Sequence, residues 1–402
     1  MGSQNGSTPH SRPRILIITT VELAFDPRAR RAAGEAGARG LAVQGLCISD
    51  EQGQSAVPVK RVPSLHLEQR IRAAGLGRLA RGSRVVREVR GVYRLGRHAL
   101  ITARFVRAAR GLERCEIIHA NDFDTLPAGA HLARRWHSRL VYDSHELYTF
   151  QEPDPPRLYC AVVLRIERAL ARRSNAVITV SERFAALLSE LLWLERPPFI
   201  VMNCPPVQPA PEPAAHDRQL RVIYQAAVGP GRRVEDVVEA AAHAGDAHIT
   251  IRVVGADTKA LTRLIEAKGL GDRVELSDPV PAGTLVEALV PVEVGVIINR
   301  PVTMNDELAT PNKLFEYIQA RLPIASSRLP MVERILNANG NGAYVDFATP
   351  ESTADELRSF VLDVLPRFTD DTLDRAATNV NWERDEVALF RTLDAALAAR
   401  PT

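Results

Sequence analysis

The sequence has few cysteines, no long apolar run and no apolar leader. Its four cysteines, Cys47, Cys115, Cys160 and Cys204, lie far apart and form no CxxC pair. We therefore expect neither a disulfide framework nor a zinc site, and we expect most of these thiols to be buried as small apolar groups. No run of about 18 apolar residues occurs, and residues 1–13 are polar and lack the apolar core of a signal peptide. A cytoplasmic protein without a membrane-spanning helix is expected.

What the chain does contain is an alternation of strand and helix patterns. With 402 residues, of which 46% are hydrophobic, it can bury large cores and is expected to form two domains. An apolar run at 14–20 has strand length, and Asp26 and Pro27 then predict a helix start, as N-cap and first-turn proline. Further strand candidates are 41–48, 116–120, 139–143 and 176–180, and helical patterns cover 84–113, 124–136, 157–173 and 182–194. Such alternation predicts a doubly wound parallel sheet.

A break in composition divides the chain. Residues 204–219 contain five prolines and no apolar periodicity, which is typical of a semi-rigid linker. A second alternation then runs through strand candidates at 220–224, 249–254, 274–276, 292–298 and 324–325. The sequence therefore predicts an α/β protein with two doubly wound Rossmann-like domains. Because such sheets bind ligands beyond the carboxyl ends of their strands, the site is expected in a cleft between the two domains.

The segment 310–326 carries the most specific signal. Thr310 is predicted to cap a helix whose first turn holds Pro311, and the free N–H groups of such a helix end attract phosphate. Glu316 follows about one and a half turns later, on a short amphipathic helix that leads into the strand at 324–325. An anion site with a carboxylate behind it, available to a pair of hydroxyls, suits a nucleotide sugar.

Several motifs occur in a fixed order in both halves. They are DPRARR at 26–31, IHANDFDTLPAG at 118–129, VYDSHEL at 141–147, VITVSE at 177–182 and NKLFEY at 312–317. Together they resemble the GT-B glycosyltransferases of family 4, over residues 14–398. The resemblance implies a GT-B fold with a disordered N-terminus at 1–13, an acceptor-side domain at 14–203, the linker at 204–219, a nucleotide-sugar-binding domain at 220–380 and a helix at 381–402 that crosses back to the first domain.

The resemblance also implies a reaction. A hexosyltransferase-like enzyme of this kind moves a sugar from a UDP- or GDP-linked donor to an acceptor, with retention of configuration and without a cofactor or metal. The acceptor is left open between a small natural product, a glycan and a lipid-linked molecule. Because the departing diphosphate gathers negative charge, cations and helix N-termini are expected to supply most of the stabilisation. The sequence does not define an oligomeric state.

The resemblance also places site residues on the donor side. Arg232 matches the family's diphosphate-binding cation, with Arg233 beside it as a second cation, and Glu316 matches the carboxylate that binds the ribose. Further donor-binding candidates, at or near the helix start, are Glu307, Thr310, Pro311, Asn312 and Lys313. Leu308 stands where the family often has a glutamate that touches the sugar, so Glu307 or Asp306 is the remaining carboxylate candidate there.

The catalytic candidates follow strands of the first half. His119 or Asn121 matches the residue that touches the sugar near the scissile bond, and His145 ends the next strand. Glu146 either orients His145 or faces the acceptor, and Asp122 directly follows a strand. Asp122 and Asp124 imitate a metal-binding pair of another fold, but Asp124 is interpreted as a helix N-cap. No metal site is therefore predicted.

An arginine-rich helix leaves two further interpretations open. Five arginines recur at spacings of three and four, namely Arg84, Arg87, Arg90, Arg94 and Arg97. This face suits peripheral contact with an anionic membrane or a solvated surface, and the net charge of only +3 for the whole chain favours the solvated surface. Nucleic-acid binding is disfavoured because no interleaved aromatic residues accompany the arginines. A noncatalytic GT-B scaffold is the remaining alternative.

Overall fold

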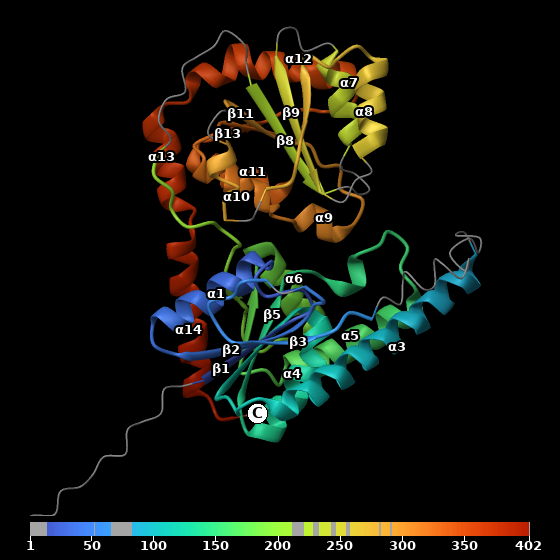
Figure 1. Ribbon diagram of the computed structural model, residues 1–402, viewed down its shortest axis with the longest axis vertical. Helices are drawn as coiled ribbons and strands as arrows, with labels where there is room; N and C mark the ends of the chain where they lie inside the picture. The colour runs from blue at the N-terminus through green and yellow to red at the C-terminus, as the bar shows by residue number, and fades with distance from the viewer. Residues whose placement is uncertain are drawn as a thin grey trace, which may run out of the picture.

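The computed structural model describes residues 14–51, 53–65, 83–210, 221–227, 233–242, 247–254, 258–280, 283–289 and 292–401. Arg232 and the linker residues 211–219 lie outside these ranges. The described residues form two parallel sheets flanked by helices (Figure 1). The predicted α/β class with two doubly wound sheets is confirmed.

The first sheet has the strand order β3-β2-β1-β4-β5-β6-β7, all parallel. Its strands are β1 (Arg14–Thr19), β2 (Ala42–Ile48), β3 (Val59–Val62), β4 (Ile117–Asn121), β5 (Arg139–Ser144), β6 (Ala176–Thr179) and β7 (Phe199–Ile200). One face is covered by α3 (Arg84–Ala108), α4 (Asp122–Trp136), α5 (Arg157–Ala171) and α6 (Glu182–Leu192), and the other by α1 (Pro27–Ala38) and α14 (Trp382–Ala398). Because β1, β4 and β5 lie in the middle of the sheet, the residues that follow them meet at one edge.

The second sheet has the order β10-β9-β8-β11-β12-β13 and is again parallel. Its strands are β8 (Arg221–Ala227), β9 (His248–Val254), β10 (Val274–Ser277), β11 (Val294–Ile297), β12 (Ile324–Ser326) and β13 (Gly342–Tyr344). Helices α7 (Val234–Ala241), α8 (Thr258–Ala267) and α12 (Pro350–Ser359) pack on one face. The other face carries α10 (Asn312–Gln319), α11 (Pro330–Asn339) and α13 (Asp370–Asn379), and the short α9 (Met304–Leu308) lies toward the first half (Figure 1).

Helix α14 joins the halves by packing on the first sheet. Trp382 and Phe390 belong to the apolar cluster that α1 forms with β1. Asp385 accepts hydrogen bonds from the backbone N–H groups of Met202 and Cys204, at 3.1 and 3.3 Å. Burial raises the pKa of this carboxyl to about 6. The last helix therefore packs on the first half, and it contacts the segment through which the chain passes from the first half to the second.

Two predicted caps differ from the structure. Thr310 is not the N-cap of its helix, because α10 begins at Asn312 and Pro311 takes the cap position with extended backbone angles, φ −64° and ψ 141°. Asp124 is not an N-cap either, since α4 begins at Asp122 and Asn121 precedes it. Asp124 instead accepts a hydrogen bond from the Tyr148 hydroxyl at 2.9 Å. In both cases the helix starts at a position other than the one that side-chain preference alone indicated.

The arginine-rich face of α3 packs against the molecule. A Cβ on Gly91 would lie 2.7 Å from the Cβ of Pro156, so glycine at this position allows α3 to approach α5 closely. The arginines on the same face then meet acidic residues ahead of α5. Arg94 contacts Glu152 at 2.8 Å and Arg87 pairs with Asp154, while Arg90 also contacts Glu152, at 3.1 Å.

Apolar side chains of α3 are exposed to solvent as well. Val85, Val89 and Val92 are 71%, 62% and 54% exposed. Arg87, Arg90 and Arg94 have acidic partners within the molecule. Contact of this helix with a membrane stays a prediction.

Candidate active site

A cleft of about 1060 Å³ lies between the two halves. Several predicted site residues line it, namely His145, Glu146, Thr310, Pro311, Asn312, Lys313 and Glu316. Residues without a predicted role line it too, among them Arg28, Gln225, Arg252 and Asn305. The cleft thus brings together side chains from the strand ends of the first sheet and the start of α10.

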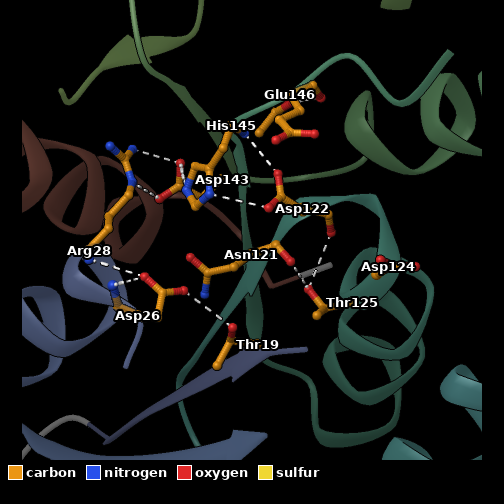
Figure 2. A network of polar contacts seen from close by, with 12 residues as sticks. Thr19, Asp26, Arg28, Asn121, Asp122, Asp124, Thr125, Asp143, His145 and Glu146 are labelled. Atoms are coloured by element: carbon orange, nitrogen blue, oxygen red, sulfur yellow. Dashed lines mark hydrogen bonds and ion pairs between the residues drawn. The ribbon is translucent and has the colours of Figure 1, made fainter. Parts of the chain in front are cut away.

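Asp143 is the centre of a buried ion network on the first-half wall. Its carboxylate accepts two hydrogen bonds from Arg28, from Nη2 at 2.7 Å and from Nε at 2.9 Å. His119 and His145 each place Nε2 at 3.2 Å from it. Although burial alone would raise the pKa of the Asp143 carboxyl, the Arg28 guanidinium and the two histidines hold it well below its usual range. Asp143 is therefore ionised, with cationic partners around it (Figure 2).

His145 lies between two carboxylates. Its Nδ1 is 3.2 Å from Asp122 and its Nε2 is 3.2 Å from Asp143, and its backbone N–H donates to Asp122 at 2.9 Å. Burial alone would lower the pKa of His145, but attraction to Asp122 and Asp143 raises it to about 10. The imidazole is consequently a cation at neutral pH, and it lines the cleft.

Asp122 adopts an unusual backbone conformation in order to reach His145. Its φ is +61°, in the left-handed region that few non-glycine residues adopt. The turn directs the Asp122 carboxylate to the loop after β5, while Asp124 points away from this cluster (Figure 2). Since strained backbone persists only where its surroundings hold it, the two hydrogen-bonding contacts to His145 account for this geometry.

His119 and Asn121 lie behind the cleft wall. His119 is 3% exposed and contacts Asp143, and Asn121 is 4% exposed and donates from Nδ2 to the Ile18 carbonyl at 3.0 Å. Neither residue lines the cleft, and Asp122 does not line it either. The structure therefore gives these three residues supporting positions around Asp143 and His145.

The second-half wall of the cleft is built on α10. Tyr317 lies flat against β11, where a Cβ on Gly295 would come within 2.5 Å of the Tyr317 ring. This close contact fixes α10 on the sheet and directs Glu316 into the cleft. Burial raises the pKa of the Glu316 carboxyl, while the positive charge of Lys313 acts to lower it. The Nζ of Lys313 lies 4.6 Å from the centre of the Tyr224 ring. A carboxylate and a cation therefore stand at successive turns of the helix.

Two predicted donor residues face away from the cleft. Arg233 caps α7 with a left-handed φ of +53° and binds Asp236 and the carbonyl oxygens of Phe347 and Ala348. This backbone turn directs its guanidinium to the α12 side of the sheet. Arg233 therefore does not lie where it was expected to attract the diphosphate. Glu307 is exposed and does not line the cleft.

Asp306 and Leu308 have structural roles in α9. The Asp306 carboxylate accepts from the backbone and hydroxyl of Thr303 at 3.1 and 2.9 Å, in a capping box. Leu308 is 8% exposed and belongs to the apolar cluster of the first half, together with Leu147. Leu308 is thus a packing residue between the halves.

Sequence reasoning assigned no role to Asp143, Arg28, Gln225, Arg252 or Asn305. A signal existed for Asp143, which ends the strand before His145, and for Arg252, a single charge within an apolar strand. Arg28 could not be found in this way, because its partner lies 115 residues away in the sequence.

Two further observations concern metals and membranes. Within the described ranges, no group of three or more His, Cys, Asp or Glu side chains is placed to hold a metal ion. The metal independence of the reaction stays a prediction. None of the helices that the structure describes is long and apolar enough to cross a membrane.

Comparison with known proteins supplies the fold family. Residues 38–204 match the model of Glycosyltransferase Family 4. Among solved structures, HepE of Anabaena in complex with UDP and glucose is similar at a TM-score of 0.67 and 14% identity, over 95% of this chain and 100% of that chain. Sucrose-phosphate synthase from Thermosynechococcus elongatus follows at a TM-score of 0.63 and 16% identity, over 96% and 100% of the two chains.

A third solved structure, the lipopolysaccharide outer core galactosyltransferase WaaB in its apo form, is similar at a TM-score of 0.60 and 12% identity, over 96% of this chain and 99% of that one. A search of curated proteins found no match to the sequence. At these identities the likeness to the solved structures shows the GT-B fold, and the family match covers the first half.

Proposed function

We infer that this GT-B protein, similar to Glycosyltransferase Family 4 over residues 38–204, is a retaining glycosyltransferase that moves a sugar from a nucleotide diphosphate sugar to an acceptor. One observation carries the inference. The cation of His145 in the first half lines the same cleft as Lys313 and Glu316 in the second. A departing diphosphate needs cations, and a ribose needs a carboxylate, so the two walls together suit a nucleotide sugar.

The donor is oriented by α10. Its diphosphate lies near the uncapped N–H groups at Asn312 and near Lys313, and its ribose hydroxyls bind Glu316. UDP- and GDP-linked sugars are both candidates. UDP is favoured by the similarity to HepE, whose structures contain UDP, UDP with glucose, and UDP-glucose.

The positive charge of His145 supports the proposed transfer with retention. A protonated imidazole cannot take the proton of the acceptor hydroxyl, so it serves by stabilising the leaving group. The acceptor oxygen attacks the anomeric carbon on the face that the diphosphate leaves, the bond from that carbon to the phosphate oxygen breaks, and the same phosphate oxygen takes the acceptor's proton. No metal is required for this step, since His145 and Lys313 supply positive charge.

The acceptor binds on the side of Glu146 and is a small natural product, a glycan or a lipid-linked molecule. A lipid-linked acceptor is motivated by the exposed Val85, Val89 and Val92 of α3, with Arg84 and Arg97 nearby in the helix. The protein would then contact a membrane from the cytoplasmic side without spanning it.

The proposal is tested first by nucleotide binding. Thermal unfolding of the full chain is measured with UDP, GDP and TDP, since a ligand at 100 times its dissociation constant stabilises by about 2.7 kcal/mol. Glu316→Gln is expected to abolish most of this shift, and Glu307→Gln, which changes an exposed carboxylate outside the cleft, is expected to retain it. If no nucleotide raises the unfolding temperature, the assignment fails.

A noncatalytic GT-B scaffold is the second candidate, motivated by the packing role of Leu308 where the family often has a sugar-binding carboxylate. Such a scaffold would bind the nucleotide but would neither transfer nor slowly hydrolyse a nucleotide sugar. Release of the nucleoside diphosphate from UDP-glucose, followed over hours, separates the two candidates.

A further inference from the structure

We propose that Gln225 and Arg252 form a positioning relay that holds the Glu316 carboxylate toward the donor's ribose and thereby sets a preference for ribonucleotide over 2′-deoxyribonucleotide donors. The proposal rests on the proposed function, because it assigns further residues to the same site. It concerns residues that touch Glu316 directly or through one side chain, on strands β8 and β9.

Arg252 is a buried cation in an otherwise apolar strand. It is 7% exposed, lines the cleft, and its Nε has no hydrogen-bond partner. Across the described part of the chain, no carboxylate lies within ion-pair distance of its guanidinium. From beyond that distance, Arg252 attracts the Glu316 carboxylate and acts to lower its pKa. Keeping a cation buried in this way is costly, so a site that retains one requires a reason. That reason is its contact with Gln225.

Gln225 stands beside Arg252 in the parallel register of β8 and β9. The Nη1 of Arg252 donates to the side-chain oxygen of Gln225 at 2.7 Å. Because a guanidinium donates hydrogen bonds and never accepts them, the oxygen of the Gln225 amide must face Arg252. The amide nitrogen is thereby forced toward Glu316, to which it donates at 3.1 Å. Arg252 therefore fixes which way round the amide stands.

The orientation of the Gln225 amide determines which oxygen of Glu316 is open to a ligand. Its Oε2 receives the hydrogen bond from Gln225, while its Oε1 accepts none from the residues that the structure describes. Glu316 lies four positions after Asn312, which places it about 6 Å along α10 from the expected diphosphate site. That is the distance of a ribose from its diphosphate. A carboxylate with one oxygen held and the other open can accept from the vicinal hydroxyls of a ribose.

Apolar residues of the cleft fit the rest of the nucleoside. Because β10 lies next to β9 at the edge of the sheet, the loop after β10 brings Pro279 and Val280 to the side of Arg252 away from Gln225. These residues and Leu285 line the cleft and suit a base. The lining therefore offers Asn312 to the diphosphate, Glu316 to the ribose and these apolar residues to the base. Gln225 and Arg252 lie beside the ribose position, where they can influence recognition of its hydroxyls.

The test compares matched nucleotides. Calorimetric titrations of the full chain use UDP and 2′-deoxy-UDP, with GDP and 2′-deoxy-GDP in parallel. The variants are Gln225→Met and Arg252→Met, which keep side-chain length and remove the polar groups. Arg252→Lys keeps a cation and a donor for Gln225. The control is Arg221→Met, at the opposite end of β8 from Gln225.

The wild type is expected to bind the ribonucleotide at least about tenfold more tightly than its deoxy analogue, the effect of one hydrogen bond to a charged group. Gln225→Met and Arg252→Met should reduce this ratio about fivefold or more, mainly by weakening ribonucleotide binding. Arg252→Lys should restore most of the ratio, and Arg221→Met should leave it unchanged.

Other outcomes overturn the relay in distinguishable ways. If both variants weaken the two nucleotides equally, Gln225 and Arg252 act on the phosphate or base or only on folding, and the relay is wrong. If the wild type binds both without preference, the relay is wrong while the proposed function stands. If the wild type binds no nucleotide, the proposed function itself fails. Unfolding temperatures of each variant identify any that do not fold, and either methionine variant alone suffices for the comparison.

Discussion

Replacing Asp143 by asparagine should destabilise the first half of the molecule and lower the pKa of His145. The side chains of Asp143 and Arg28 are 2% and 5% exposed, and the two are joined by two hydrogen bonds. Removing one charge from a buried pair leaves the other uncompensated, at a cost of about 3–5 kcal/mol. Asparagine keeps an acceptor oxygen for one Arg28 donor, so we expect a loss of about 3 kcal/mol. This is a large share of the stability of a typical domain.

The assay is urea unfolding at pH 7.5, followed by tryptophan fluorescence. The chain's three tryptophans are Trp136, Trp193 and Trp382. Trp136 packs against the first-half core and Trp382 against the opposite face of the same sheet, while Trp193 caps α6. Their fluorescence therefore reports the first half without contribution from the second. This matters because a protein of two domains does not unfold in a single step.

The matched control is Asp154→Asn. Asp154 pairs with Arg87 but is 73% exposed, and exposed pairs contribute less than about 1 kcal/mol. If Asp143→Asn changes the unfolding free energy by no more than this control, the buried ion network around Asp143 does not stabilise the fold.

A second measurement addresses the charge of His145 directly. Its imidazole resonances, assigned by their loss in His145→Gln, should titrate near pH 10 in the wild type. In Asp143→Asn the midpoint should fall, because one of the two carboxylates that raise this pKa is gone. An unchanged midpoint would show that Asp143 is not a cause of the raised pKa.

Three further changes probe other parts of the structure. The His145 charge stabilises the fold fully below about pH 6.5, the pKa of an unfolded histidine, and this contribution is lost as the pH rises through about 10, so the unfolding free energy should fall across that interval, less steeply in His145→Gln. Gly295→Val should push the Tyr317 ring away, cost about 1–3 kcal/mol and weaken UDP binding, because even a Cβ would lie 2.5 Å from that ring. Leu308→Glu should lower the unfolding temperature and expand the molecule in small-angle scattering, since it buries a charge between the halves.

Each of these has a control and a contrary result. If the unfolding free energy falls equally steeply with pH in the wild type and in His145→Gln, the charge of His145 does not stabilise the fold. Gly271→Ala is the control for Gly295→Val because nothing lies within 4 Å of its added Cβ. Equal stability and equal UDP binding of the two variants would contradict the close contact of Gly295 with Tyr317. Glu307→Leu, at an exposed position next to Leu308, should leave the scattering profile unchanged. Leu308→Glu with a wild-type unfolding temperature would show that α9 is not packed as described.

Most of the fold could be predicted because buried parallel strands are written as apolar runs. Three short edge strands, β3, β7 and β13, were not predicted. Val59–Val62 contains two charged residues, and Phe199–Ile200 is too short to show a pattern, so both depend on pairing with a neighbouring strand. Edge strands of this kind are determined by the sheet and not by their own residues.

Residues of the cleft could be predicted where they belong to a local motif, and were missed where their position depends on tertiary contacts. Glu316 and Lys313 line the cleft and were selected from the sequence because their helix carries a recognisable motif. Their roles stay predictions. Arg233 was expected in the cleft as the neighbour of Arg232, but its left-handed backbone turns the guanidinium to the other face of the sheet. His119 was expected at the sugar, yet Asp143 stands between it and His145. A backbone angle and a long-range ion pair are invisible in a motif.

Helix α9 connects the two walls of the cleft. The Asn305 side chain accepts from the backbone N–H of Leu147 at 2.9 Å and donates to its carbonyl at 3.1 Å. Leu147 follows His145 by two positions, so these hydrogen bonds connect the loop of the cation to the segment that precedes α10. Leu308 adds apolar contact from the same helix. A carboxylate at 308 would have to leave this contact to reach a sugar, and the chain therefore uses the position to join the two halves of the cleft instead.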